Sequence, residues 1–230
     1  MVAEGLRLVE ELLASGLPIS ELFVTEGFQG DEMLRAGTAA LLPEGAEVIG
    51  VTGELMAAMA DTVTPQGVLA VLPIPELPAA GGPRFVLIPD QVRDPGNLGT
   101  MLRTAWAAGV TQVLLPPGTV DPTNPKVVRA GMGAHFHLSI RTVGWDAIGS
   151  AVACADVWLA EAGRGQAYHA VDWRGDVALI IGGEAAGAGG EARDAAACVQ
   201  IPMRRGVESL NAAVAAGILL FEAARQRGEG

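Results

Sequence analysis

From Phe85 to the C-terminus, the sequence alternates short apolar runs with segments of helical periodicity. Runs such as RFVLIPD, VTQVLLPP and DVALIIGGE favour strands, and each is followed by a turn rich in Gly, Pro or Asn. Continuous apolar strands that alternate with helices are typical of a mostly parallel sheet with both faces covered. The sequence therefore predicts an α/β fold with a parallel sheet in this part of the chain.

The segment before Phe85 shows the same alternation on a smaller scale. EGLRLVEELLASG, DEMLRAGTAALLPEG and GELMAAMADT are predicted helices, and ISELFVTE, AEVIGVT and GVLAVLPI are predicted strands. Residues 75–84 are rich in Pro, Gly and Ala, which is typical of a semi-rigid linker. We therefore expect a small α/β domain at 1–74, a linker at 75–84 and a larger domain at 85–230.

Composition restricts the classes of function. The 230 residues carry a formal net charge of -11, whereas a protein that coats nucleic acid without specificity is usually basic. Cys154 and Cys198 lie far apart and lack a zinc-binding spacing, so we expect buried free thiols and no metal site. No signal peptide is evident and the longest apolar runs are too short to cross a bilayer, so we expect a cytoplasmic protein.

Three clusters of glycines and polar residues each follow a predicted strand. They are DPGNLGTMLR, IIGGEAAGAGG and IPMRRGVESLNAA, and their polar members of interest are Asn97, Arg103, Glu184, Ser209 and Asn211. Taken singly, each cluster has a structural interpretation, because Asn97 and Ser209 stand where helix caps are expected and glycine-rich loops are common. Parallel strands end at one edge of a sheet, where α/β proteins bind ligands, so we expect the clusters to form one site.

Other types of site are less favoured. A Walker or Rossmann nucleotide site is not predicted, because neither GK[ST] nor GxGxxG follows the first strand of the larger part. His135 and His137 lie in HFHLSIRTV, which we expect to be a strand with both histidines on one face. Two histidines are too few for a metal site, so structural or RNA-facing roles are favoured for them.

The three clusters resemble, in order, the signature motifs of the SpoU (TrmH-type) RNA ribose 2′-O-methyltransferases of the SPOUT superfamily. The segments that carry the resemblance are DPGNLGTMLRTA, IIGGEAAG and IPMRRGVESLNAAVAAGI. Residues 1–72 are similar to the L30e-like RNA-binding domain that is often fused in front. The resemblance implies a C-terminal trefoil knot, S-adenosylmethionine as the cofactor, an RNA substrate, no metal, and a homodimer formed through the C-terminal domain.

The resemblance also implies roles for the polar residues. Arg103 matches the motif-one arginine, which would contact the phosphate of the target nucleotide. Because arginine stays protonated in proteins, a positioning and electrostatic role is favoured over that of a general base. Asn97 would orient the hydroxyl group or Arg103, and Glu184 would orient Arg103 or a neighbouring backbone group. Ser209 and Asn211 would shape the pocket near the ribose. The cofactor contacts, made mostly by backbone atoms, are expected at Leu159, Ala160, Gly182, Gly183, Ile201, Met203 and Leu210.

The sequence does not identify which RNA is the substrate. Ribosomal RNA is favoured over tRNA, because the front domain resembles modules that read structured RNA. An antibiotic-resistance enzyme that modifies the ribosome is an alternative left open within that class. The residues also leave open a non-catalytic RNA-binding protein of the same fold, and a methyltransferase acting on a base atom such as guanine N1. The acidic charge predicts weak binding to arbitrary RNA and a requirement for a shaped target. Residues Leu210, Val214, Ile218 and Phe221 recur at near-helical spacing, which gives the last helix an apolar face for a dimer.

Overall fold

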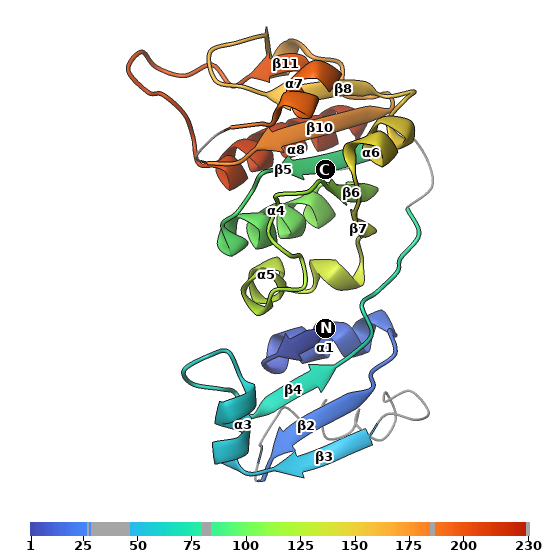
Figure 1. The fold of residues 1–230 in the computed structure, drawn as a ribbon, viewed down its shortest axis with the longest axis vertical. Coiled ribbons are helices and arrows are strands. Elements are labelled where there is room, and N and C mark those ends of the chain that lie inside the picture. The colour runs from blue at the N-terminus through green and yellow to red at the C-terminus, as the bar shows by residue number, and fades with distance from the viewer. Residues whose placement is uncertain (27, 29–46, 80–83, 185–186, 229–230) are drawn as a thin grey trace.

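The computed structural model describes residues 1–26, 28, 47–79, 84–184 and 187–228. Its described strands form two separate sheets, one of four strands and one of seven. Figure 1 shows the sheets toward opposite ends of the molecule, with helices α1, α5 and α4 between them. The helix predicted in DEMLRAGTAALLPEG lies outside the described residues.

The four-stranded sheet has the order β1-β4-β2-β3 and mixed direction. Strands β1 (Val2–Glu4) and β2 (Glu21–Thr25) pair antiparallel with β4 (Val68–Val71), and β3 (Glu47–Val51) pairs parallel with β2. Helix α3 (Gly53–Met59) follows β3. Strand β1 was not predicted, because three residues are too few to show a two-residue period.

Helix α1 (Leu6–Ser15) covers the four-stranded sheet with its apolar stripe. Its buried residues are Leu8, Val9, Leu12 and Leu13, at the spacing of one helical face. The same apolar cluster takes in Val128 and Phe136, which belong to the larger part of the chain. The two parts of the chain therefore share buried apolar surface.

The seven-stranded sheet has the order β7-β6-β5-β10-β8-β11-β9, and every pair of neighbours is parallel. Its strands are β5 (Phe85–Asp90), β6 (Gln112–Leu115), β7 (Ile140–Thr142), β8 (Asp156–Ala160), β9 (Gln166–Ala167), β10 (Val177–Gly182) and β11 (Ala197–Gln200). The central strands β5 and β10 are buried almost throughout, which explains their continuous apolar sequences.

Helices cover both faces of this sheet, as the sequence predicts. The covering helices are α4 (Pro95–Ala107), α6 (Trp145–Ala151), α7 (Gly190–Ala195) and α8 (Ala212–Arg227). Helix α5 (Pro125–Gly131) packs on α4, and two short 3-10 helices, η1 (Ala134–Phe136) and η2 (Tyr168–Ala170), complete this part of the chain. Alternate residues of β5 face opposite sides: Phe85 and Leu87 belong to the core beneath α4 and α8, and Val86 and Ile88 to the core beneath α6 and α7. The trefoil knot stays a prediction.

Only the second part of HFHLSIRTV is the strand that the sequence predicts, since β7 covers Ile140–Thr142. The chain reverses at Met132 and Gly133, whose φ angles are 45° and 93°, and it then forms η1 before β7. His135 is buried, with Nε2 2.8 Å from the carbonyl oxygen of Pro122, and burial lowers its pKa. His137 is exposed and points to α1, so the two histidines do not share a face.

Ion pairs of Arg129 and a hydrogen bond of His137 join the two parts of the chain. Arg129 Nη2 lies 2.6 Å from Asp61 Oδ2, and its Nη1 lies 3.5 Å from Glu4 Oε2. His137 Nε2 lies 2.8 Å from Glu11 Oε1 of α1. These contacts and the shared apolar cluster fix α1 and β1 against the helices of the larger part.

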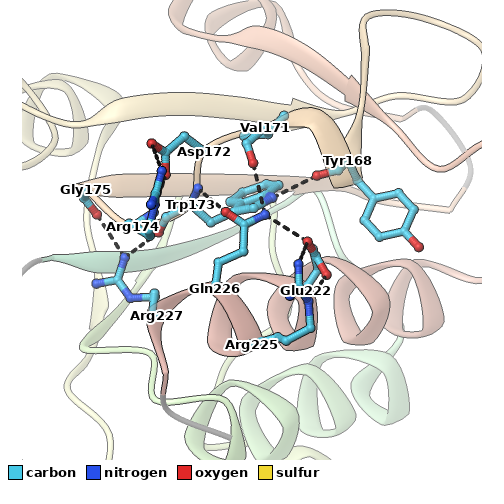
Figure 2. Close-up of polar contacts among 10 residues, drawn as sticks. All are labelled: Tyr168, Val171, Asp172, Trp173, Arg174, Gly175, Glu222, Arg225, Gln226 and Arg227. Carbon is cyan, nitrogen blue, oxygen red and sulfur yellow. Dashed lines mark hydrogen bonds and ion pairs between the residues drawn. The ribbon is translucent and has the colours of Figure 1, made fainter.

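Figure 2 shows how the C-terminal turns of α8 are fixed to the segment between η2 and β10. Gln226 Oε1 accepts a hydrogen bond from the backbone N–H of Trp173 at 3.1 Å, and its Nε2 donates to the carbonyl oxygen of Val171 at 3.1 Å. Arg227 donates to the carbonyl oxygens of Trp173 and Gly175, both at 2.8 Å. Because Trp173 is fully buried, this network fixes the C-terminal end of α8 against the core.

Two other expectations concern cysteines and membranes. Cys154 and Cys198 are free, but Cys154 is exposed, so the expectation of a buried thiol is wrong for it. Cys198 is half-buried, and burial raises the pKa of its thiol. In the part of the chain that the structure describes, no helix is long and apolar enough to cross a membrane, and no group of three or more His, Cys, Asp or Glu could hold a metal ion.

Candidate active site

A cavity of about 510 Å³ lies where β8, β10 and β11 end. Its walls come from these strand ends, from the loop after β10 and from residues 201–215. The structure gathers around it all seven residues predicted to contact a cofactor, namely Leu159, Ala160, Gly182, Gly183, Ile201, Met203 and Leu210. These residues come from three distant segments, so the order of the sheet brings them together.

Two glycines at the end of β10 allow the chain to fold closely around the cavity. A Cβ atom on Gly183 would collide with the backbone carbonyl of Gln91, and one on Gly182 would lie 2.5 Å from the backbone nitrogen of Ala188. Both neighbours are backbone atoms that cannot rotate away. The glycine pair is therefore required for the loop after β10 to return over the strand end.

Asp90 lies beneath this loop and was not predicted as a site residue. It is fully buried at the end of β5, directly opposite Gly182, and its Oδ2 accepts a hydrogen bond from the backbone N–H of Gly189 at 2.6 Å. Its Oδ1 has no partner among the described residues. Burial raises the pKa of Asp90, and the bond from Gly189 partly opposes this shift. A carboxylate at the end of an otherwise apolar strand was the signal available in the sequence.

Side chains of the three clusters meet beside the cavity in a hydrogen-bonded chain. Asn97 Nδ2 donates to Glu184 Oε1 at 2.5 Å, and Asn211 Nδ2 donates to Asn97 Oδ1 at 3.0 Å. The Oδ1 of Asn211 accepts from the backbone N–H of Ala213 at 2.9 Å. The amide of Asn97 therefore links the loop after β10 to the N-terminus of α8, and we call Asn97, Glu184 and Asn211 the polar triad.

The helix caps differ from the predicted ones. Asp94 caps α4, because its Oδ1 accepts from the backbone N–H of Asn97 at 2.8 Å. Asn211 caps α8, which begins at Ala212, so Ser209 lies two residues before the cap and is exposed on the cavity wall. The expectation that Asn97 and Ser209 cap helices is therefore wrong. Because Asn97 is not a cap, its side chain is available to the triad.

Arg103 stands apart from the cavity. It lies on α4, nearly two turns after Asn97, and is exposed. It is not among the residues that line the cavity, and within the described part of the chain it has no hydrogen bond or ion pair. Its guanidinium group is therefore free to bind an anion that approaches from solvent.

Two charged residues on the cavity wall, Glu161 and Arg193, were not predicted as site residues. Glu161 follows β8 directly, and its Oε1 lies 3.6 Å from Arg193 Nε. Its Oε2 lies 3.5 Å from Arg164 Nη1. A charged residue immediately after a strand was the available signal, but such residues are common at the ends of strands.

The fold and the site define a class of protein: an α/β enzyme that binds a ligand at the carboxyl ends of a parallel sheet. The model of the SpoU rRNA Methylase family matches residues 84–221, and the model of the MRM3-like substrate binding domain matches residues 1–70. The chain belongs to the SpoU rRNA methylase family and is a SpoU-type methyltransferase.

Similar proteins support this assignment. The chain is 34% identical to 23S rRNA (guanosine(2553)-2′-O)-methyltransferase RlmP of Bacillus subtilis, over 95% of this chain and 86% of the relative. It is also 34% identical to the mitochondrial rRNA methyltransferase 3A of Danio rerio, over 98% of this chain, but spans only 64% of that relative. The SpoU methyltransferase AviRb from Streptomyces viridochromogenes, solved in complex with AdoMet, superposes with a TM-score of 0.83 at 25% identity and covers 100% of this chain and 91% of its own.

Proposed function

We propose that this chain transfers the methyl group of S-adenosylmethionine to a ribose 2′-hydroxyl of ribosomal RNA. The observation that carries the proposal is the polar triad, which stands beside a cavity at the strand ends. Ribosomal RNA is favoured over tRNA because relatives that match nearly the whole chain are named as rRNA methyltransferases. A cytoplasmic location stays a prediction.

The cavity fits a cofactor of this kind. Its volume lies in the usual range for small-molecule sites, roughly 300–1,000 Å³. Ile201, Met203 and Leu210 supply apolar walls for a flat adenine ring, and Gly182 and Gly183 expose backbone groups that a side chain would cover. When bound, S-adenosylmethionine supplies an electrophilic methyl group. The cofactor would be held by these apolar side chains and glycines, together with Leu159 and Ala160 at the end of β8.

The polar triad provides orientation for the second reactant. Asn97 is held by Glu184 on one side and by Asn211 on the other, so its amide has little freedom to rotate. A fixed amide next to the cavity can orient a ribose hydroxyl, and Ser209 lies on the same wall. Holding two reactants in the correct geometry supplies a large part of the rate enhancement in such reactions. The hydroxyl proton leaves to the substrate phosphate or to water.

We assign Arg103 to the phosphate of the target nucleotide. It is exposed and has no acidic partner among the described residues. A planar guanidinium group can donate two parallel hydrogen bonds to a phosphate. This contact would hold the RNA backbone while the triad orients the ribose.

The proposed enzyme acts as a homodimer through the larger part of the chain. Three apolar side chains lie exposed on α8 or just before it: Leu210, Val214 and Phe221, with exposed fractions of 37%, 52% and 51%. They belong to the apolar face that the sequence predicts, while α8 buries its other face in the core. An exposed apolar face of this kind is typical of an interface.

Transfer of tritiated methyl groups from S-adenosylmethionine to unmodified rRNA transcripts tests the proposal. Replacing Arg103 with Ala should abolish most of the transfer and leave cofactor binding unchanged, whereas Arg141→Ala, which removes an exposed arginine of β7, should have no effect. Full activity of the Arg103→Ala variant would refute the site assignment. If the wild-type chain binds RNA but no S-adenosylmethionine, the chain is instead a non-catalytic RNA-binding protein.

A further inference from the structure

Trp106 is an exposed aromatic residue on the helix that carries Arg103. Its exposed fraction is 37%, whereas Leu98, Met101, Leu102 and Ala105 of the same helix are fully buried. Residues three apart in a helix are neighbours on its surface, with Cβ atoms about 5–6 Å apart. Trp106 therefore lies beside Arg103, and one nucleotide could reach both side chains.

The indole ring of Trp106 is held in a fixed orientation. The imidazole ring of His137 stacks on it with 4.2 Å between ring centroids and 3° between planes. His137 is held in turn by Glu11 of α1, with 2.8 Å between Nε2 and Oε1. The stacked pair therefore lies at the junction of the two parts of the chain, where α4, α5 and α1 follow one another in Figure 1.

An ordered and exposed aromatic pair of this kind suits an unpaired nucleobase. Proteins that read RNA commonly stack splayed bases on Trp, Tyr, Phe or His side chains. Stacking is important here because the chain has a net charge of -11 and attracts RNA poorly through charge alone. The charge of Arg103 on the same helix, which has no acidic partner among the described residues, matches the phosphate that accompanies the base. A second copy of the chain is a less suitable occupant, because the exposed apolar residues Val214 and Phe221 lie on α8 and the stacked pair lies on the α5 side of α4.

We propose that Trp106 and His137 form a stacking platform for an unpaired base of the RNA substrate, at or next to the nucleotide whose phosphate Arg103 binds. This inference rests on the proposed function and adds a specificity determinant to it. The platform selects RNA in which a base near the target ribose is flipped out or single-stranded. It also makes RNA binding depend on the packing of the two parts of the chain, because Glu11 orients His137.

Binding of unmodified rRNA transcripts, measured by filter retention without any methyl transfer, tests the platform. Trp106→Leu should weaken binding roughly tenfold, in the range measured for loss of one stacked base, and should leave the dissociation constant for S-adenosylmethionine unchanged. Trp106→Phe, which keeps an aromatic ring, should remain within about threefold of the wild type. Ile74→Ala, which removes an exposed apolar side chain elsewhere, is the control.

A second readout does not depend on the stability of the Leu variant. RNA should quench the tryptophan fluorescence of the wild-type chain and of Trp145→Phe, but much less that of Trp106→Phe. Wild-type affinity in the Leu variant, equal losses in the Leu and Phe variants, or no rRNA binding by the wild type would each overturn the platform. A change in the mass of the Leu variant in solution would instead identify Trp106 as a contact between copies. A wild type that binds rRNA through Trp106 but transfers no methyl group would refute the proposed function and leave the platform standing.

Discussion

Replacing Asn97 with Ala removes the central member of the polar triad. The change breaks one neutral hydrogen bond, to Asn211, and one bond to a carboxylate, from Asn97 to Glu184. Such bonds contribute about 0.5–1.5 and 1.5–3 kcal/mol respectively, and water replaces part of both because Glu184 and Asn211 are exposed. We therefore expect a loss of about 1–2 kcal/mol in the free energy of unfolding, measured by urea denaturation.

The expected effect of Asn97→Ala on catalysis is larger than its effect on stability. Misplacement of a reacting group by about 1 Å costs roughly 100-fold in rate, which corresponds to about 2.7 kcal/mol of activation free energy. The assay is the initial rate of methyl transfer at saturating RNA and S-adenosylmethionine. Thr100→Ala, at an exposed position on the same helix, is the control and should keep the wild-type rate.

A double-mutant cycle separates the coupling between Asn97 and Glu184 from the loss of rate that each substitution causes alone. If Glu184 acts by holding Asn97, the variant with both Asn97→Ala and Glu184→Ala should be about as slow as the Asn97→Ala variant alone. The coupling energy should then reach at least about 1 kcal/mol. Effects that add within about 0.3–0.5 kcal/mol would refute the view that the triad works as one unit.

Three further predictions concern stability and assembly. Gly99→Val should lower the free energy of unfolding by about 1–3 kcal/mol, because the new Cβ would lie 2.6 Å from the carbonyl oxygen of Val127, where α4 packs on α5. Urea denaturation measures the effect, and an unchanged midpoint of unfolding would contradict this close packing. For Asp90, burial raises the pKa above its usual 3.8, so its contribution to stability is complete below that pH and is lost as the pH rises through the raised value. The free energy of unfolding of Asp90→Asn should therefore rise relative to the wild type by about 1.4 kcal/mol per pH unit within that window, and a difference that does not vary with pH would contradict the assignment. Phe221→Glu, at an exposed position on α8, should halve the mass measured in solution at micromolar concentration, whereas a monomeric wild type would refute the dimer.

The fold was largely predictable because its signals are local. The continuous apolar runs of β5 and β10 identify buried parallel strands, and Gly16 at the end of α1 marks a helix terminus. The strand predicted at residues 135–143 forms only at Ile140–Thr142, because the chain reverses at Met132 and Gly133 and then forms η1. The reversal requires a positive φ at Met132, a residue that rarely adopts one. A methionine in the sequence does not indicate a turn of this kind.

The site was predictable as a gathering of residues but not as a set of bonds. The order of the strands brings Asn97, Glu184 and Asn211 to one edge, which the sequence alone indicates. The choice of Asn211 over Ser209 as the cap depends on where α8 begins, and helix ends are poorly defined by periodicity. Asp90 was missed because its importance depends on Gly189, 99 residues later, which reaches it only in the folded chain.

The most direct test of the central claim is the position of the transferred methyl group. The wild-type chain, tritium-labelled S-adenosylmethionine and unmodified 16S, 23S and transfer RNA transcripts are incubated together, and the labelled RNA is hydrolysed with alkali. A ribose that carries a 2′-O-methyl group cannot attack the adjacent phosphate, so the account predicts label in an alkali-resistant dinucleotide from ribosomal RNA. Label in free nucleotides would place the methyl group on a base, and label confined to transfer RNA would contradict the proposed substrate.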